Sequence, residues 1–330
     1  MALTTQGTVG TGAGAAVFLA KYWDKLLLDN LYPDLYFYQF ADRKVLPANF
    51  GKVIFFTKWK KLGAAVGLAE NTAAVTTSGF SATMVSAQVS GYAKPVKFTD
   101  FLLMTSVSDI VQGATQETAK ALALKMDTVT RTKISAAGTL RIAQGQATKG
   151  ISVCGMRAGD LIAAASVLRN NNAKTFQDGT YGCIANPNQI YDLQSNTVAG
   201  NWTDINKYGT GEALNAIYRG EIGKMYGVRV VESSAVPKLV SAAGTSAVIG
   251  LSANASGYNA FVLGPGCVGA VELAHGAGRP QIIIKPLGSG GATGDAADQF
   301  ASVTAKVYFT AVNLDATNRL VRIASGKTLF

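Results

Sequence analysis

The sequence predicts an α+β protein built from a few long elements and several shorter ones. Three patterns predict this fold class: a long two-stranded excursion between residues 50 and 98, an amphipathic helix from about 109 to 137, and an alternating strand over 302–312. With 330 residues, of which 48% are hydrophobic, the chain is long enough to bury one large core or two adjoining ones. Disorder throughout is therefore not expected.

The N-terminal residues have the composition of an arm. Residues 1 to about 20 are rich in Gly, Ala and Thr and carry no charge before Lys21, so they cannot build a core of their own. A helix is expected from Ala13 to about Leu31, where apolar residues recur at helical spacing before Pro33. The start lacks a signal peptide's basic residues, and no apolar run reaches about 18 residues, so neither secretion nor membrane spanning is expected.

The excursion between Phe50 and Phe98 is predicted to be a long hairpin. Its outward strand is "GKVIFFTKWKKL" and its return strand is "SATMVSAQVSGYAKPVKF", and a Gly-, Ala- and Thr-rich stretch joins them. Between Arg43 and Lys97 there are eight basic residues and one acid, Glu70. A hairpin with this charge and little core is expected to be stable mainly when it lies across a complementary surface.

The next segment is predicted to be the longest helix of the chain. Ser108 or Asp109 can cap it, and it would extend for roughly 40 Å to about Ala137. Oppositely charged residues at helical spacing, Glu117 with Lys120 and Asp127 with Arg131, indicate an exposed face. The apolar face is expected to contain Ile110, Ala114, Ala121, Leu122, Met126 and Val129.

Shorter elements are predicted to follow. One helix covers Asp160 to Asn170, and another begins with Asn186 as its cap and Pro187 in its first turn. Strands are expected at "GVRVVES", "AFVLG", "AVELA", "QIIIKP" and "RLVRIAS". In the alternating strand, one face is expected to hold Val303, Ala305, Val307, Phe309 and Ala311.

Candidate chemistry is sparse. Cys267 and His275 are close enough in sequence for a thiolate and imidazole pair, but no orienting Asn or Asp is nearby, so a buried core cysteine is the preferred interpretation. Asp295 and Asp298 lack the ligand spacing of a calcium loop, and the glycine-rich strings lack the surroundings of a nucleotide site. One histidine and three widely separated cysteines do not predict a metal centre. No catalytic, cofactor-binding or metal-binding residue is therefore expected.

The strongest candidate for a functional surface is the basic and aromatic cluster of the hairpin. It contains Lys58, Trp59, Lys60 and Lys61. Such residues can neutralise and stack on nucleic acid, but they can equally form a solvated hairpin face or the polar rim of a protein interface. We expect that changing the three lysines to Glu impairs assembly, because it reverses the charge of the hairpin.

Five collinear stretches carry a family resemblance that extends from about Trp23 to Ile323. They are "GLAEN" around Glu70, "ALALKMDTVTRTKI", "IANPNQIYDLQSN" with Trp202 shortly after it, "GEIGKMYGVRVVESSAVP" and "GDAADQFASVTAKVYFTAVNLDATNRLVRIAS". Their order, after an arm and a basic hairpin, resembles the Hong Kong 97-like capsid fold. Within it, the sequence is similar to the major capsid proteins of N-four-type podophages.

The resemblance implies a subunit with named parts. They are an N-terminal arm at 1–45, an extended loop at 46–100, a peripheral domain at 101–150 with its spine helix and again at 286–330, and an axial domain at 151–285. The residues implied to face a neighbouring subunit or DNA are Lys58, Trp59, Lys60, Lys61 and Glu70. No covalent cross-link is carried over, because no motif identifies the residues that would form one.

The resemblance also implies a function and partners. The chain would be a structural protein that assembles as hexamers and pentamers into the icosahedral head shell of a tailed bacteriophage, around double-stranded DNA, without a membrane. A separate scaffolding protein is expected because the sequence shows no sign of a cleaved N-terminal segment, and a portal and a decoration protein are further implied partners. The chain would be found in the virion after assembly in the host cytoplasm.

Two other classes of function stay open on the residues alone. The first is a basic nucleic-acid-binding protein that does not form shells, because the net charge is +10 and the sequence pI is about 9.4. The second is an enzyme with Cys267 as its nucleophile, which a single histidine and the absence of a nucleophile motif disfavour. Low charge favours the shell interpretation, because only 15% of the residues are charged and large protein interfaces need apolar surface.

Overall fold

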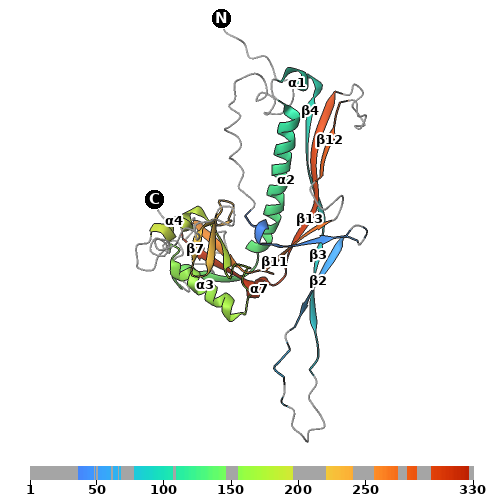
Figure 1. Cartoon of the computed structure of the whole chain (residues 1–330). Helices are drawn as coiled ribbons and strands as arrows, with labels where there is room; N and C mark the ends of the chain where they lie inside the picture. Colours follow the sequence, from blue (N-terminus) through green and yellow to red (C-terminus); the bar gives the residue numbers. More distant parts are fainter. Residues whose placement is uncertain are drawn as a thin grey trace.

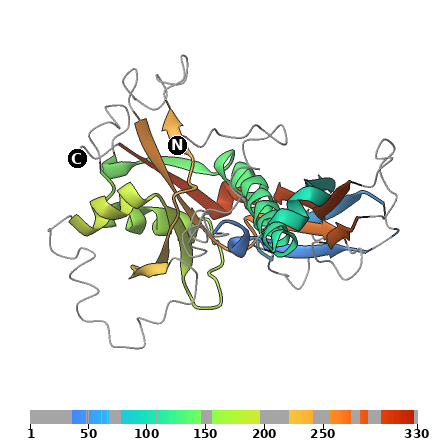
Figure 2. The same ribbon diagram turned by 90° about the horizontal axis from the view of Figure 1, so that it is seen from above.

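The computed structural model contains two β-sheets, one long helix and a projecting hairpin (Figure 1). The two sheets form separate lobes, which lie side by side in the view from above (Figure 2) and are joined by connecting segments between strands. The described residues are 36–47, 49, 51–60, 62–65, 67, 78–106, 109–145, 155–195, 221–240, 256–273, 281–287 and 299–326.

The first lobe is a five-stranded sheet covered on one face by the long helix. Its strands are β1 (Asp42–Leu46), β4 (Ser90–Thr99), β11 (Val268–Leu273), β12 (Gln281–Lys285) and β13 (Phe300–Asn313). Helix α2 (Ile110–Ser135) lies along β13, whose alternate residues from Ala301 to Ala311 are buried beneath it. The apolar face predicted for this strand is confirmed.

The second lobe is a seven-stranded sheet with two helices. Strand β10 is central, between β14 and β6, and all of its described side chains are buried. Helices α3 (Ala158–Asn170) and α4 (Pro187–Ser195) add buried leucines and alanines to the core of this lobe. The strands are β5 (Thr139–Ile142), β6 (Tyr181–Ala185), β7 (Glu221–Met225), β8 (Val228–Glu232), β9 (Lys238–Val240), β10 (Ser256–Leu263) and β14 (Leu320–Ser325).

Most of what was predicted for the long helix is confirmed. The Asp109 side chain caps it by accepting a hydrogen bond from the Gln112 backbone N–H, and the Glu117–Lys120 ion pair lies on its surface at 3.2 Å. The exposed position expected for Asp127 is wrong. This carboxylate is buried and accepts hydrogen bonds from the backbone N–H groups of Phe37 and Tyr38, at 2.8 and 3.0 Å.

The buried Asp127 joins the long helix to the segment that precedes β1. This segment contains a short 3-10 helix, η2 (Tyr38–Phe40), and the Phe37 ring packs edge-on against Phe261 of the other lobe at 6.2 Å. Burial raises the pKa of Asp127, and the two backbone donors oppose that shift. The segment is therefore held by both lobes.

The hairpin is shorter than predicted. Strand β2 (Val53–Trp59) pairs in antiparallel register with β3 (Ala82–Gln88), which confirms two paired strands. The return strand continues as β4, but that part pairs with β13 rather than with the outward strand. The second half of the predicted return strand therefore belongs to the five-stranded sheet, where it pairs with ten residues of β13, from Phe300 to Phe309.

The smaller predicted elements are present. The two helices after residue 158 and the strands at 228–232, 256–263, 268–273, 281–285 and 320–325 occur where they were expected. The Asn186 side chain accepts a hydrogen bond from the Asn188 backbone N–H at 3.1 Å, as an N-cap does. Three short helical turns complete the described chain: α1 (Asp100–Thr105), η3 (Ala143–Gly145) and α7 (Ala316–Arg319).

The division into arm, extended loop, peripheral domain and axial domain stays a prediction. The two sheets show to which lobe the strands of each segment belong. Strand β5 follows the long helix and pairs with β14 in the seven-stranded sheet. Strand β11, by contrast, belongs to the five-stranded sheet, although β10 just before it is central to the other. The chain therefore passes between the lobes at 138, 264–267 and 314–319.

Some predicted features lie outside the described residues. They are the helix at 13–31, the hairpin residues Lys61 and Glu70, Cys154, Trp202, His275, Asp295 and Asp298.

Candidate interaction surface on the hairpin

The two faces of the hairpin differ in what they contact. On the inner face, Phe56 of β2 and Ala87 of β3 are buried against Leu46 and Val271 of the five-stranded sheet. The partly buried Ile54 and Val85 extend this contact. Because side chains alternate along a strand, the residues between them are directed away from the sheet. The base of the hairpin is thus attached to the body by a small apolar cluster.

The outer face of the hairpin carries large apolar side chains that nothing in the described chain covers. Phe55 is 60% exposed, Trp59 is 61% exposed and Met84 is 66% exposed. The register of β2 and β3 places these residues on the same face as Val53, which is also exposed. Their side chains form one contiguous stripe along a two-stranded ribbon.

The stripe ends in an aromatic pair. Phe80, which precedes β3, stacks on Trp59 with ring centroids 4.6 Å apart and an interplanar angle of 16°. Both rings are largely exposed, so the stack adds to the apolar surface of the stripe. We name the outer stripe by its five residues: Val53, Phe55, Trp59, Phe80 and Met84. Single exposed apolar residues are common on soluble proteins, but a continuous stripe of this kind marks an interaction surface.

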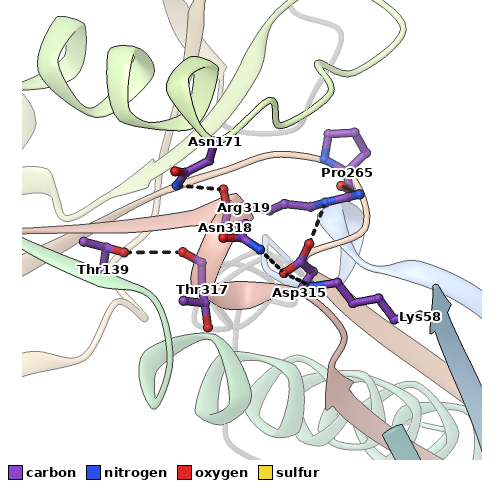
Figure 3. Close-up of polar contacts among 8 residues, drawn as sticks. All are labelled: Lys58, Thr139, Asn171, Pro265, Asp315, Thr317, Asn318 and Arg319. Atoms are coloured by element: carbon purple, nitrogen blue, oxygen red, sulfur yellow. Dashed lines mark hydrogen bonds and ion pairs between the residues drawn. The ribbon is translucent and has the colours of Figure 1, made fainter. Parts of the chain in front are cut away.

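Lys58 does not belong to the outer stripe. Its side chain lies on the inner face, and its Nζ is 2.7 Å from Oδ1 of Asp315, which precedes α7 (Figure 3). Asp315 also accepts a hydrogen bond from Asn318 at 2.9 Å and pairs with Arg319 at 3.4 Å. The ion pair therefore connects the hairpin to the turn where the chain passes from one sheet to the other.

The crossing turn is itself held from several sides. Arg319 donates a hydrogen bond to the backbone oxygen of Pro265 at 2.7 Å (Figure 3). The backbone N–H of Leu314 donates a hydrogen bond to the backbone oxygen of Cys267 at 3.0 Å. Asp42 lies near Arg319, and burial raises the pKa of this carboxyl while the guanidinium lowers it. Asp315 thus accepts Lys58 from a position that the local hydrogen bonds have already set.

The predicted cluster is therefore divided by the structure. Trp59 is on the outer stripe, Lys58 is on the inner face, and Lys60 is exposed just beyond β2. Lys61 and Glu70 lie outside the described residues. Sequence reasoning missed the stripe because "VIFF" is apolar at both odd and even positions, which hides the alternation. The register shows the alternation, because Met84 pairs with Thr57, which lies on the same face of β2 as Phe55 and Trp59.

The two described cysteines are poorly suited to act as nucleophiles. Cys183 and Cys267 are free and buried, and burial raises the pKa of each thiol to about 12. This confirms the interpretation of Cys267 as a core cysteine. Within the described part of the chain, no group of three or more His, Cys, Asp or Glu side chains is placed to hold a metal ion. No described helix is long and apolar enough to cross a membrane.

Another buried polar contact supports the body beneath the hairpin. The Tyr38 hydroxyl donates a hydrogen bond to a carboxylate oxygen of Glu272 on β11, and burial together with this contact raises the pKa of Tyr38 above its ordinary value. The Arg43 guanidinium lies over the Tyr38 ring, 4.4 Å from its centroid. These contacts brace β11, the strand against which the inner face of the hairpin packs.

Solved structures of phage capsids are similar to this chain over nearly its whole length. The chain is similar over 99% of its length to 99% of a chain in the capsid structure of cyanophage P-SCSP1u, at 18% identity and a TM-score of 0.66. It is similar over 98% of its length to 99% of a chain in the capsid of Ralstonia phage GP4, at 11% identity and a TM-score of 0.71.

A third similar structure is the acid-stable capsid of Helicobacter pylori bacteriophage KHP30, which matches 98% of this chain and 100% of its own at 10% identity and a TM-score of 0.63. The chain has the Hong Kong 97-like capsid fold. The predicted fold class is confirmed. The chain matches no family model and no curated protein.

Proposed function

We propose that this chain is the major capsid protein of a tailed bacteriophage, a structural subunit that assembles as hexamers and pentamers into an icosahedral head shell. The observation that carries the proposal is the outer stripe, on a hairpin that projects far from both lobes of a capsid fold (Figure 1). A projecting two-stranded ribbon with one exposed apolar face is at most marginally stable in water by itself. Laid over a neighbouring copy, the same face becomes buried.

The mechanism is physical rather than chemical. Each copy would bury its outer stripe on a neighbour, and symmetric repetition would combine many such contacts into a closed container. The Lys58–Asp315 ion pair and the inner apolar cluster would set the angle at which the hairpin leaves the body. A ribbon held at its base presents its outer face in one orientation, which reduces the conformational entropy lost when copies associate.

The finer parts of the proposal concern partners and location. The shell would enclose double-stranded DNA, and the net charge of +10 is suited to a wall beside a polyanion. A separate scaffolding protein, a portal and a decoration protein would complete the particle, and assembly would take place in the host cytoplasm before the protein becomes part of the virion. In this role the chain has no enzymatic activity.

The first test is electron microscopy of the purified full-length chain, expressed with and without a candidate scaffolding protein, together with sedimentation. Closed shells or flat hexameric sheets are the expected result. A chain that stays small under every assembly condition would contradict the proposal. If such a small species also bound DNA with a steep salt dependence, the alternative of a free nucleic-acid-binding protein would replace it.

A further inference from the structure

Strand β12 is an edge strand with an unusual surface. It pairs with β13 through one edge, and no described strand lies along its other edge. Its three consecutive isoleucines, Ile282, Ile283 and Ile284, are 44%, 40% and 50% exposed. Proteins normally protect an apolar edge strand of this kind, because its unpaired N–H and C=O groups can pair with another chain. An apolar edge that is retained is therefore a candidate docking site.

The two faces of this edge differ in chemistry. Ile282 pairs with Ala305 and Ile284 pairs with Val303, and both partners are fully buried on the side of helix α2. The two isoleucines thus extend the apolar face of the sheet beyond the helix. On the opposite face, Ile283 pairs with Thr304 and Lys285 pairs with Ser302. A strand added at this edge would meet Ile282 and Ile284 on one face, and Ile283 with Lys285 at its end on the other.

The opposite face is basic across the sheet. The register places Lys97 of β4, Ser302 of β13 and Lys285 of β12 in one row, and Lys306 is on the same face. Strands β4, β12 and β13 contain no acidic residue. Lys97 lies over the Phe300 ring at 3.3 Å and Lys306 over the Tyr308 ring at 4.7 Å, contacts that leave the positive charge unneutralised.

The base of the hairpin covers only the other end of this face. There Val271 of β11 is buried beneath the hairpin residues Phe56 and Ala87. The half of the face that carries the lysines is uncovered by any described residue, and it lies on the side of the sheet opposite α2 (Figure 1). Among the described residues, none therefore covers either the free edge or the basic face.

We infer that the free edge of β12 binds an extended segment of a separate protein in which apolar and acidic residues alternate. The segment adds to the sheet as a further strand, with its apolar residues beside Ile282 and Ile284 and an acidic residue beside Lys285. A second copy of this chain is a poor match, because none of its described strands alternates apolar and acidic residues. Nucleic acid would use the lysines but would leave the isoleucines and the edge hydrogen-bonding groups unused.

The test uses the full-length chain and three fluorescent synthetic peptides of about eight residues, the length of a typical strand. The first alternates Val and Glu, the second alternates Val and Lys, and the third has the composition of the first with a central Pro that prevents strand pairing. Binding is measured by fluorescence anisotropy at about 0.15 M salt. The Val–Glu peptide is expected to bind, and the other two are expected not to bind.

Two variants locate the binding site. Lys285→Glu is expected to weaken binding of the Val–Glu peptide by about tenfold or more and to create binding of the Val–Lys peptide. Ile284→Thr is expected to weaken binding of the Val–Glu peptide without creating binding of the Val–Lys peptide. Lys60→Glu is the matched control, because it makes the same charge change on an exposed residue of the hairpin, away from β12. It is expected to bind like the wild type. Circular dichroism of each variant checks that it is folded.

The inference does not depend on shell formation, since the peptides can bind the full-length chain in any assembly state that leaves the edge free. Failure of the wild-type chain to bind the Val–Glu peptide, or equal binding of the proline-containing peptide, would overturn it. Equal weakening by Lys60→Glu and Lys285→Glu would show a general charge effect and would also overturn it. So would a double-stranded oligonucleotide that binds with the same dependence on Lys285, since the face would then be a polyanion site.

Discussion

The hairpin and the seven-stranded sheet show two ways in which one chain uses apolar residues. In β10 every described side chain is buried, and its neighbours β6 and β14 are almost as fully enclosed. In β2 only Phe56 is buried, while Phe55 and Trp59 are mostly exposed. The sheet therefore obtains its stability within the subunit, whereas the outer stripe of the hairpin contributes only when a second surface covers it. Five substitutions or conditions test this contrast.

The largest effect is expected in the buried sheet. Phe261→Ala removes a fully buried ring of β10 that packs against Phe37. The lost burial and the cavity should lower the free energy of unfolding by about 3–5 kcal/mol, as measured by denaturant titration. Phe55→Ala removes the same side chain from the outer stripe and is the matched control. Similar losses from the two substitutions would show that the stripe is already buried within the subunit.

The next effect concerns the buried carboxylate that holds the segment before β1. Asp127→Ala removes the acceptor of two backbone N–H groups, from Phe37 and Tyr38, and should cost about 1–3 kcal/mol of unfolding free energy. Asp127→Asn keeps an acceptor and should recover most of that loss, because burial also disfavours the charged form. Thermal unfolding of both variants measures the difference. An equal loss from Ala and Asn would contradict the hydrogen-bonding role.

Because its two described cysteines are buried, the protein should lose stability as the pH rises above 9. Burial raises the folded-state pKa of Cys183 and Cys267 from 9.0 to about 12, so above pH 9 the unfolded state loses these protons first. Stability that is complete below pH 9 should therefore fall by about 1 kcal/mol for each thiol between pH 9 and 10. Denaturant titrations across this range measure the slope, and replacement of both cysteines by Ala should remove the part of it that the thiols contribute, leaving a smaller part from the buried Tyr38.

A smaller effect is expected at the base of the hairpin. Lys58→Ala breaks the ion pair with Asp315, and because the lysine is about half exposed the cost in stability should be about 0.2–1 kcal/mol. Its consequence for assembly should be larger, because the hairpin loses a contact that sets its angle. Lys60→Ala changes a neighbouring exposed lysine and should assemble normally. Equal yields of shells from both variants, counted by electron microscopy, would remove the role of Lys58.

The smallest effect on stability is expected on the outer stripe. Phe55→Ser removes a mostly exposed ring, so the free energy of unfolding of the subunit should change by less than about 0.5 kcal/mol. Shell yield should nevertheless fall strongly, because the stripe is the surface proposed to be buried between copies. Sedimentation of the variant beside the wild type provides the measurement. Normal shells together with normal stability would show that the stripe does not carry the assembly contact.

Local patterns predicted the long elements well. Helix α2 and strand β13 were predicted because each buries one face along its whole length, which leaves a period of 3.6 or 2 in the sequence. The N-cap roles of Asp109 and Asn186 were also visible, since a cap depends on residues two or three positions away. These features need only neighbours in sequence, so a single sequence contains them.

The candidate surface was predicted only in part. The hairpin was recognised, but its lysines were treated as one cluster, and the structure places Lys58 on Asp315, which is 257 positions away. Asp127 was expected on the surface because Arg131 follows one turn later. In the structure its partners are backbone groups 89 and 90 positions distant. Contacts between residues so far apart leave no spacing in the sequence from which to predict them.

By itself, the sequence determined the fold class, the positions of most helices and strands, and the excess of basic over acidic residues, because these depend on local periodicity and composition. The tertiary structure decided which face of the hairpin is apolar and uncovered by described residues, which lysine is paired, and that the apolar strand β12 lies at an edge of the five-stranded sheet. The physical reason is that exposure is a property of the packed molecule. A residue such as Phe55 or Phe56 is equally apolar in the sequence, and only the sheet beneath the hairpin distinguishes them.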